Sequence, residues 1–432
     1  MERLRTRLPN TPISENEMLS IEQIVNDPEF VRQKLVDRGE DPPIDQMIEL
    51  DSQRRALVHE GDELRAKRNE VSRGGKPSPE QIVEMRSIGE RIKTIEAEQE
   101  GIQGKLHELL IVLPNLPKDA VPVGADEESN IVVREGSAPE ERDFEVEPNW
   151  DFAERTGIFD LPAGANMSGA RFYVLKGKGA ALQRALSDWM LDVHTREHGY
   201  IEIAPPFMIR SEAMTASGNL PKFADTMFHD DEDDLWLIPT AEVTLNYLHA
   251  GEIIDPGRLP LKYVAHTPCF RRERTAAGRD TRGIKRVRQF EKVEMFQFVD
   301  PKYSEGVLDE MIADAIDLCE RLGLPWRLLA LATGDISFQS AQTFDLEVWA
   351  PGSQEWLEVS SLSDCTDFQG RRSNTRFRPE GGGSPGFVNS LNGSGLALPR
   401  IVIAILENYQ QADGTVSIPE VLRPYTGFNS IG

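Results

Sequence analysis

Two series of apolar residues with heptad spacing constrain the fold more than any other feature of this sequence. In the first series a leucine or valine recurs every seven residues, at Leu50, Leu57, Leu64 and Val71. The second series alternates spacings of three and four, with one polar interruption: Met85, Ile88, Ile92, Ile95, Gln99, Ile102, Leu106 and Leu109. Such spacing places residues along one stripe of a helix. A Gly/Pro-containing segment at residues 73–80 separates the two series, which predicts an antiparallel helical hairpin.

Charged residues occupy most other positions of both predicted helices, so we expect the hairpin to project into solvent as an arm. Taken one at a time, its basic side chains are typical of the solvated flank of a coiled coil. Taken together, they form a surface that fits a polyanion: Arg54, Arg55, Arg65, Lys67, Arg68, Arg73, Lys76, Arg86, Arg91 and Lys93. Upstream, residues 1–17 predict a flexible polar extension, and residues 18–39 predict short helices divided at Asp27-Pro28.

The length and composition of the chain limit the functions that it can have. The 432 residues carry a formal net charge of -24, which argues against indiscriminate nucleic-acid binding and leaves specific binding to local basic patches. The length favours two or three domains, and no apolar run approaches the roughly 18 residues that span a bilayer. Three isolated cysteines predict free thiols in a reducing cytoplasm, with no zinc site: Cys269, Cys319 and Cys365.

The rest of the chain has a mixed pattern. A proline-rich, acidic stretch at residues 114–130 marks a domain boundary. Beyond it, helical periodicity predicts helices at residues 181–199, 304–323 and 396–411. Strands are predicted within residues 200–209, 235–245, 261–273, 288–298, 344–350 and 357–365. Because many connections are too short for a crossover helix, the pattern favours an antiparallel sheet.

Two motif-like signals are discounted. Residues 164–171 have the glycine spacing of a phosphate-binding loop but lack its Lys-Ser/Thr pair. His194 and His198 share one face of a predicted helix with the spacing of metal ligands. No third ligand accompanies them, so we interpret them as a surface pair near the end of the helix.

Residues 269–298 collect much of the chemistry of the chain. They read as a strand, an arginine-rich loop and a returning strand. Alternation along a strand places Arg271 with Glu273, and Phe290 with Glu294. A cleft lined by both pairs offers a guanidinium for a phosphate, an aromatic plate for a purine and carboxylates for an amine. From these residues alone, a salt-bridged exposed hairpin is equally compatible.

From residue 18 onward the sequence resembles the class II aminoacyl-tRNA synthetases, and specifically the bacterial-type seryl-tRNA synthetases. GYIEIAPPF, with Pro206, is similar to motif 1, and CFRRE, GRDTRG and QFEKVE within residues 269–294 are similar to motif 2. The segment that begins LNGSGLALPR, with Arg400, is similar to motif 3. IPTAEVTL, LEVSS and DFQGRRSNTRFR match further segments typical of the seryl enzymes. The union of these motifs with the arm is highly specific.

The resemblance implies an α+β fold. A class II catalytic domain, an antiparallel β-sheet flanked by helices, would occupy residues 116–432, after an all-α coiled-coil hairpin domain at residues 18–115. The implied protein is a cytoplasmic homodimer joined through its motif 1 region. Its implied activity is the ligation of L-serine to tRNA(Ser), with tRNA(Sec) as a second acceptor to consider. ATP would be the co-substrate with Mg2+, and the arm and the motif 2 loop would contact the tRNA.

The resemblance also assigns site residues by their positions in these motifs. The catalytic set is Arg271, Glu358 and Arg400. The L-serine set is Thr240, Ala241, Glu242, Arg271, Glu294 and Ser394. The ATP set is Arg271, Arg272, Glu273, Val287, Phe290, Glu358, Val359, Ser360, Ser361 and Arg400. Within it, Glu358 and Ser361 would carry Mg2+, because hard oxygen ligands suit that ion.

Two stretches depart from the family pattern. Arg272 and Arg274 stand in a stretch where relatives have small residues, and Asn389-Ser390 stands where His-Thr is common. Three alternative functions therefore stay open. One is an amino-acid:carrier-protein ligase, which would lack the long arm and use zinc. The others are a catalytically dead paralogue that only binds RNA, and a class II enzyme for another amino acid such as threonine.

Overall fold

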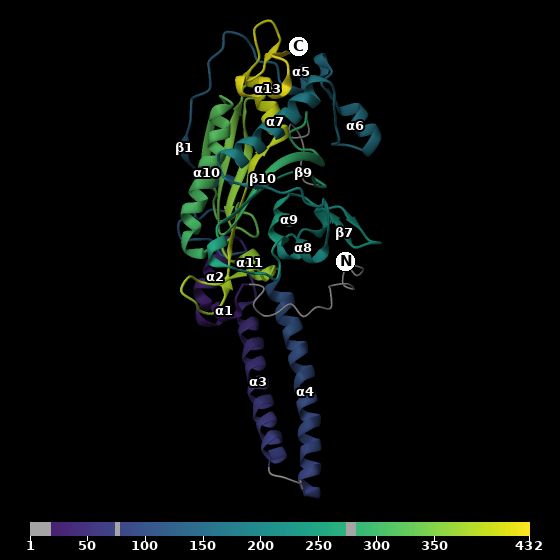
Figure 1. Cartoon of the computed structure of the whole chain (residues 1–432), viewed down its shortest axis with the longest axis vertical. Helices are drawn as coiled ribbons and strands as arrows, with labels where there is room; N and C mark the ends of the chain where they lie inside the picture. The colour runs from purple at the N-terminus through teal and green to yellow at the C-terminus, as the bar shows by residue number, and fades with distance from the viewer. Residues whose placement is uncertain (1–18, 74–77, 274–281) are drawn as a thin grey trace. The chain divides into compact units, whose positions relative to one another are not determined.

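The computed structural model describes residues 19–73, 78–273 and 282–432. They form two compact units, the first ending at Pro114 and the second beginning at Asn115 (Figure 1). The predicted extension at residues 1–17, Lys76 in the hairpin turn and Arg274 in the arginine-rich loop lie outside the described residues. Within the described ranges, no helix is both long enough and apolar enough to cross a membrane.

The N-terminal unit is all-helical, as the heptad pattern predicts. Two short helices, α1 (Ile21–Asn26) and α2 (Pro28–Asp37), are divided at Asp27, whose carboxylate accepts a hydrogen bond from the backbone N–H of Phe30. Two long helices follow, α3 (Ile44–Arg73) and α4 (Pro79–Leu110), and Figure 1 shows them side by side. A capping box formed by Ser78 and Gln81 begins α4.

The seam between α3 and α4 follows most of the predicted heptad positions. Four seam residues of α4 are buried: Ile88, Ile92, Ile95 and Leu106. Leu57 and Leu64 on α3 are half-buried, because a two-helix hairpin offers each of them a single facing helix. At the end of the seam, the predicted Leu109 is half-buried and the neighbouring Leu110 is buried, so the strongest burial shifts by one residue. The helical repeat of about 3.6 residues drifts against a seven-residue pattern, which accounts for the shift.

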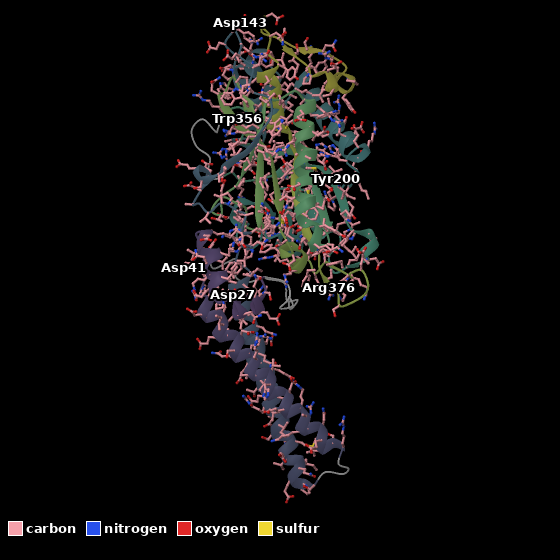
Figure 2. All side chains as sticks on the ribbon, turned by 90° about the vertical axis from the view of Figure 1, so that its left-hand side faces the viewer. Asp27, Asp41, Asp143, Tyr200, Trp356 and Arg376 are labelled. Carbon is pink, nitrogen blue, oxygen red and sulfur yellow. The ribbon has the colours of Figure 1, made fainter. Side chains whose placement is uncertain are left out.

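Charged side chains cover the outside of the hairpin (Figure 2). Arg91 on α4 reaches α3 and donates two hydrogen bonds to the carboxylate of Glu60, each 2.8 Å long. Four more arginines pair with acidic residues on their own helix: Arg54, Arg55, Arg65 and Arg86. Of the basic residues named in the sequence analysis, four form no ion pair with another described residue: Lys67, Arg68, Arg73 and Lys93. The cations of the arm thus divide into a paired set and an unpaired set.

The second unit is built on an eight-stranded sheet, antiparallel except for its edge pair β4–β9. This confirms the antiparallel sheet expected from the short connections. In spatial order its strands are β1 (Ile131–Glu135), β11 (Trp326–Ala330), β12 (Gln342–Ala350), β13 (Glu355–Asp364), β16 (Asn389–Ala397), β10 (Gln289–Val299), β9 (Leu261–Phe270) and β4 (Ile201–Glu202).

Three long helices pack on this sheet and share one apolar core with it: α7 (Lys178–Arg196), α10 (Ser304–Arg321) and α12 (Leu398–Asn408) (Figure 1). The apolar run IVIAIL makes α12 hydrophobic all round, so its middle is fully buried. The shorter helices are α5 (Asn149–Thr156), α6 (Leu161–Ser168), α8 (Ser211–Ala216), α9 (Glu242–Tyr247), α11 (Phe368–Arg372) and α13 (Arg423–Thr426).

Four small sheets complete the unit. Their strands are β2 (Phe159–Asp160) with β3 (Val174–Leu175); β5 (Met208–Arg210), β7 (Leu235–Leu237) and β6 (His229–Asp230); β15 (Gly386–Phe387), β14 (Arg376–Phe377) and β8 (Ile253–Ile254); and β17 (Val416–Ser417) with β18 (Ser430–Ile431).

Two strand predictions need correction, and one strand was missed. The strand predicted at residues 235–245 ends at Leu237, and Glu242 begins helix α9 instead. Strand β9 ends at Phe270, and Glu273 has a left-handed φ of 46°, so Arg271 and Glu273 do not share a strand face. Strand β16 was not predicted, because its asparagines and glycines have low strand propensity.

All three cysteines are free and buried, which confirms the prediction of unpaired thiols. Burial raises the pKa of each thiol: Cys269, Cys319 and Cys365. All three lie in the second unit, and the sequence of the helical unit contains none.

Candidate active site

Strand β10 presents three chemically useful side chains on one face. Phe290, Lys292 and Glu294 are two residues apart, so the pleat points them the same way. The guanidinium of Arg271 lies over the ring of Phe290, 5.2 Å from its centroid. Its Nε donates a hydrogen bond to the carbonyl of Pro239 at 3.2 Å. The structure therefore brings together Arg271, Phe290 and Glu294, on which the sequence interpretation rested.

A buried polar cluster surrounds the middle of β10. Lys292 and Glu294 form an ion pair. The hydroxyl of Thr240 donates to Glu294 at 3.1 Å and accepts from Lys292 Nζ at 2.9 Å. All three side chains are almost fully buried. Mutual pairing is what allows such charges to stay inside the protein, and it holds the carboxylate of Glu294 in one orientation.

Glu242, the first residue of α9, lies beside this cluster and is held by three amides. Its Oε1 accepts hydrogen bonds from Gln369 at 2.7 Å, Gln339 at 3.1 Å and Asn392 at 3.2 Å. Burial, and then the negative charge of Glu294, raise the pKa of Glu242 from 4.5 to about 7. The site therefore contains a carboxyl group that gains and loses its proton near neutral pH.

A β-bulge in β13 places Glu358 and Ser361 on one face. Three residues apart, they would point to opposite faces of a regular strand. The ladder with β12 skips Val359, which is the extra residue of the bulge. Ser361 therefore pairs with Asp345 on the same face as Glu358. Val359 itself is buried in the apolar core.

Asp345 is a candidate that the sequence interpretation missed. Burial, and then the negative charge of Glu358, raise the pKa of Asp345 well above its ordinary range. Its Oδ1 is buried and has no hydrogen-bond partner among the described residues. A buried carboxylate oxygen without a partner, next to a second carboxylate and a hydroxyl, fits a divalent cation with oxygen ligands. The described residues contain no cluster of three His, Cys, Asp or Glu side chains that could hold a metal ion.

Arg400, in the first turn of α12, is anchored to Glu358. Its NH1 nitrogen donates to the backbone carbonyl of Glu358 at 2.6 Å and lies 3.1 Å from Oε2 of the same residue. Burial raises the pKa of Glu358, but the charge and hydrogen bond of Arg400 outweigh it, so the pKa is lowered. Burial lowers the pKa of Arg400, but the charge and hydrogen bond of Glu358, together with other nearby carboxylates, outweigh burial, so the pKa is raised. The pair therefore stays ionised across the working pH range.

Three of the predicted site residues have apolar side chains, so they contribute buried surface to the site and no polar group. Ala241, Val287 and Val359 are buried, each with less than a twentieth of its surface exposed. Ser360 has a backbone role, because its hydroxyl donates to the carbonyl of Ser394 at 2.5 Å. Ser394 lies opposite Glu294 in the ladder between β16 and β10.

Arg272 is held by a segment different from the one that contacts Arg271. Its Nε donates to the carbonyl of Met227 at 2.6 Å, and its guanidinium lies over the ring of Phe228 at 4.9 Å. The backbone carbonyl of Glu273 accepts a hydrogen bond from Arg171.

The departures at Asn389 and Ser390 reach the same buried network. The hydroxyl of Ser390 donates to Oε1 of Gln369 at 2.7 Å, which orients the amide that binds Glu242. Asn389 is buried. Ser390 thus acts on the site through Gln369.

Sequence reasoning missed several polar residues of this site: Lys292, Gln339, Asp345, Gln369 and Asn392. Only Lys292 had a local signal, because it lies midway between Phe290 and Glu294 on the same strand face. The others come from different elements, and only the fold brings them near Glu242 and Glu358.

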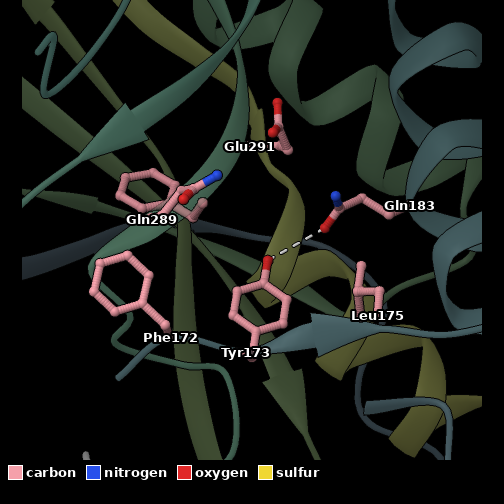
Figure 3. Close-up of a pocket in the computed structure, with 7 residues that line it drawn as sticks. Phe172, Tyr173, Leu175, Gln183, Gln289 and Glu291 are labelled. Carbon is pink, nitrogen blue, oxygen red and sulfur yellow. Dashed lines mark hydrogen bonds between the residues drawn. The ribbon is translucent and has the colours of Figure 1, made fainter. Parts of the chain in front are cut away.

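A cavity of about 180 Å³ opens beside the site (Figure 3). Phe290 forms part of its wall together with Gln289 and Glu291. Figure 3 shows Tyr173 pointing toward Gln183, whose Oε1 accepts from the tyrosine hydroxyl at 3.4 Å. Burial, and then the negative charge of Glu291, raise the pKa of Tyr173. Apart from Phe290, no predicted site residue lines this cavity.

Comparisons with known proteins cover both units. The family described as the seryl-tRNA synthetase N-terminal domain matches residues 18–117. The family described as the tRNA synthetase class II core domain (G, H, P, S and T) matches residues 224–409. Both matches agree with the resemblance drawn from the motifs.

Individual relatives match almost end to end. A serine–tRNA ligase of Thermomicrobium roseum is 54% identical over 416 residues, 95% of this chain and 94% of the relative. One from Herpetosiphon aurantiacus is 51% identical over 417 residues, 95% of this chain and 99% of the relative.

Solved structures give the same result for the fold. The seryl-tRNA synthetase of Pyrococcus horikoshii, solved with ATP, has a TM-score of 0.91 at 36% identity and covers 96% of this chain and 99% of its own. The cytoplasmic serine–tRNA ligase of Naegleria fowleri, solved with AMP, has a TM-score of 0.85 at 30% identity, with coverages of 96% and 98%. On these matches, this chain belongs to the seryl-tRNA synthetase family of class II aminoacyl-tRNA synthetases.

Proposed function

We propose that this chain is a serine–tRNA ligase, which activates L-serine with ATP and transfers it to the 3' end of tRNA(Ser). Family membership supports the reaction class. The observation that carries the proposal is the buried cluster of Thr240, Lys292 and Glu294, with Glu242 beside it and Arg271 over Phe290. It combines carboxylates for an ammonium and hydroxyl group with a cation and an aromatic ring for a nucleotide.

In the first step, a carboxylate oxygen of serine attacks the α-phosphorus of ATP. A P–O bond forms, the bond to the β-phosphate breaks, and diphosphate leaves. The serine carboxylate is already an anion, so no protein base is needed to activate it. The site must instead neutralise charge that develops on the phosphate oxygens. Arg271 would neutralise the α-phosphate, and Arg400 would hold the γ-phosphate.

In the second step, a ribose hydroxyl of the terminal adenosine attacks the carbonyl carbon of the adenylate. An ester C–O bond forms, the bond from that carbon to the phosphate oxygen breaks, AMP leaves, and the hydroxyl proton is released to solvent. Phe290 would stack on the adenine, and Ala241 and Val287 would contribute apolar walls. Glu294 would accept hydrogen bonds from the serine ammonium and hydroxyl groups. A site built to bind that hydroxyl rejects alanine, because the buried carboxylate would lose its partner.

Glu358, Ser361 and Asp345 would hold Mg2+ together with the phosphates of ATP. Their oxygen atoms are the ligands that this ion prefers, and it commonly binds to one or two carboxylates plus substrate phosphates. When bound, the ion would supply positive charge to the phosphate oxygens. The unpartnered Oδ1 of Asp345 supports this assignment.

The arm and the motif 2 loop would bind the tRNA. The unpaired cations of the arm favour phosphate contacts without first breaking an ion pair: Lys67, Arg68, Arg73 and Lys93. Exposed apolar side chains in the motif 1 region support a homodimer that covers them: Ile201, Phe207 and Met208. We place the enzyme in the cytoplasm, where its tRNA substrate is found.

ATP–diphosphate exchange, screened across all the proteinogenic amino acids, tests the proposed specificity. Exchange is expected with serine and at least about 100-fold less with alanine or threonine. Fastest exchange with threonine would assign another class II specificity, and absence of exchange with every amino acid would favour an RNA-binding paralogue. Serine exchange without tRNA charging would favour transfer to a carrier protein.

A further inference from the structure

The two histidines interpreted from sequence as a surface pair form part of a hydrogen-bonded chain that ends in the core. That interpretation is wrong, because His194 is fully buried. Its Nε2 lies 3.2 Å from the carbonyl oxygen of Gly395, and its Nδ1 lies 3.0 Å from Nδ1 of His198. Nε2 of His198 lies 3.1 Å from Oδ2 of Asp317 on α10. The chain thus runs from a partly exposed carboxylate to the backbone of β16.

The chemistry of each partner fixes the protons along this chain. A carbonyl only accepts, so Nε2 of His194 must carry a hydrogen. Burial, and then the charge of His198, lower the pKa of His194 to about 3, so its ring is neutral and its Nδ1 must accept. Nδ1 of His198 therefore donates the hydrogen bond to His194, and Nε2 of His198 faces Asp317. Arg321 also forms an ion pair with Oδ2 of Asp317 at 2.7 Å.

Gly395 needs this donor because its strand is irregular at that point. In the ladder between β16 and β10, Ser394 pairs with Glu294, and the next pair joins Ala397 to Lys292. Gly395 and Leu396 have no Cα partner in that ladder, and the pairing of β16 with β13 extends only to Gly393. A buried carbonyl without a ladder partner is costly unless a side chain satisfies it.

Side chains hold both carbonyls at this irregularity. Ser360 donates to the carbonyl of Ser394, and His194 donates to that of Gly395. The imidazole lies so close to the backbone that a Cβ on residue 395 would lie 2.4 Å from Nε2. Glycine at 395 and histidine at 194 therefore fit as a pair. The consecutive residue Ser394 belongs to the proposed serine site.

We propose that His194, supported by His198 and Asp317, is a positioning residue that holds the Ser394–Gly395 backbone in the geometry that binds the amino-acid substrate. The proposal rests on the proposed function of this site. His194 contacts neither substrate nor cofactor and acts through the backbone that carries Ser394. Arg400, five residues after Gly395, keeps its own anchors on Glu358, so the ATP side is held independently.

Two variants separate positioning from general stability. His194→Leu removes the donor, and His194→Gln keeps an N–H at the position of Nε2. In ATP–diphosphate exchange, His194→Leu is expected to raise the KM for serine about tenfold, the effect of losing one hydrogen bond of about 1.4 kcal/mol. The KM for ATP should stay within about twofold of the wild type, and His194→Gln should recover most of the serine KM. Thermal unfolding checks that each variant is folded.

Equal serine KM values in the wild type and His194→Leu would overturn the proposal, as would a parallel rise of both KM values. If His194→Leu does not fold, nitrogen-15 NMR of the wild-type histidines decides the matter. His194 is expected to be neutral with its proton on Nε2, and a proton on Nδ1 instead would refute the assignment. Wild-type exchange that requires another amino acid would contradict the proposed function, and the variants would then be compared by their KM for that amino acid.

Discussion

The helical arm and the sheet unit use charge in opposite ways. On the arm, Arg65 and Arg86 each pair with an acid three or four residues away along the same exposed helix. In the sheet unit, Lys292, Glu294 and Glu242 are buried and are held by partners from distant parts of the chain. Exposed pairs contribute about 0–1 kcal/mol each, whereas removing one partner of a buried pair costs about 3–5 kcal/mol.

This difference has a consequence for function. Weak, exposed charges can exchange an acidic neighbour for a phosphate at low cost, which suits a surface that binds and releases RNA. Buried, mutually fixed charges do not rearrange, which suits a site that must present donors to a developing charge. Changes in the two units should therefore affect different steps of the reaction.

The largest expected effect is in the sheet unit. Arg271→Ala should slow adenylate formation, measured by ATP–diphosphate exchange, by at least about 100-fold, because it removes a preorganised cation from the transition state. Arg271→Lys should recover little, since an ammonium cannot make a bidentate contact. Arg272→Ser is the matched control, because Arg272 is held by Met227 and Phe228 instead. It should keep most of the exchange activity, and a near-wild-type rate for Arg271→Ala would refute the role of Arg271.

Shortening the arm should affect the other step. Glu60 and Arg91 already contact each other across the hairpin, so a short Gly/Ser linker can join them in place of residues 61–90. The buried base of the unit, including Met47 and Leu110, stays intact. Serine-dependent exchange should be preserved, while charging at limiting tRNA(Ser) should fall by about 30-fold or more as phosphate contacts are lost. Undiminished charging would mean that the arm does not bind the RNA.

Glu242 provides a test by pH. With a pKa of about 7, its carboxyl is mostly protonated at pH 6 and mostly ionised at pH 8. Because the ionised form favours the ammonium group of serine, the serine KM should fall about tenfold between these values, following the ionised fraction. Glu242→Gln should remove this dependence. A serine KM in the wild type that does not change with pH would contradict the assignment.

The raised pKa of Glu242 also predicts how the stability of the folded protein changes with pH. The folded-state pKa of Glu242 is raised above the ordinary value of 4.5, so the folded chain binds the extra proton between pH 4.5 and about 7. The contribution of this carboxyl to stability is present below pH 4.5 and is lost as the pH rises through 7. Thermal unfolding of Glu242→Gln against the wild type should show the variant gaining relative stability with rising pH.

The smallest expected effect is the difference between the unpaired and the paired basic residues of the arm. Replacing the unpaired Lys67, Arg68 and Lys93 by Gln should weaken tRNA(Ser) binding several-fold. The salt dependence of the binding constant should fall by the amount expected for the loss of up to about three phosphate contacts. Replacing the same number of paired cations, Arg55, Arg65 and Arg86, is the control and should have less effect. Binding measured at several salt concentrations distinguishes the two sets, and equal losses would mean that pairing does not select the RNA contacts.

What could be predicted from the sequence follows the same division. The arm could be predicted because its determinants are local: a heptad stripe and a Gly/Pro-containing turn. The site could be predicted mainly from the resemblance of its motifs to a known family. Strand alternation alone would place Glu358 and Ser361 on opposite faces of the sheet, and only the bulge at Val359 brings them to the same face. Asp345 and Gln369 carry no local signal. The sequence pattern predicts an exposed end for the helix that carries His194. That prediction is wrong, because Gly395 and α10 cover this end of the helix.

The distribution of cysteines makes the two units separately observable. All three native thiols are shielded in the sheet unit, where burial disfavours the reactive thiolate, and the arm has none. A single cysteine introduced at exposed Arg68 would therefore accept a fluorophore or spin label selectively in the folded protein. Its signal would report the arm alone as tRNA arrives, while slow modification of the native thiols would time the opening of the sheet unit in the same sample.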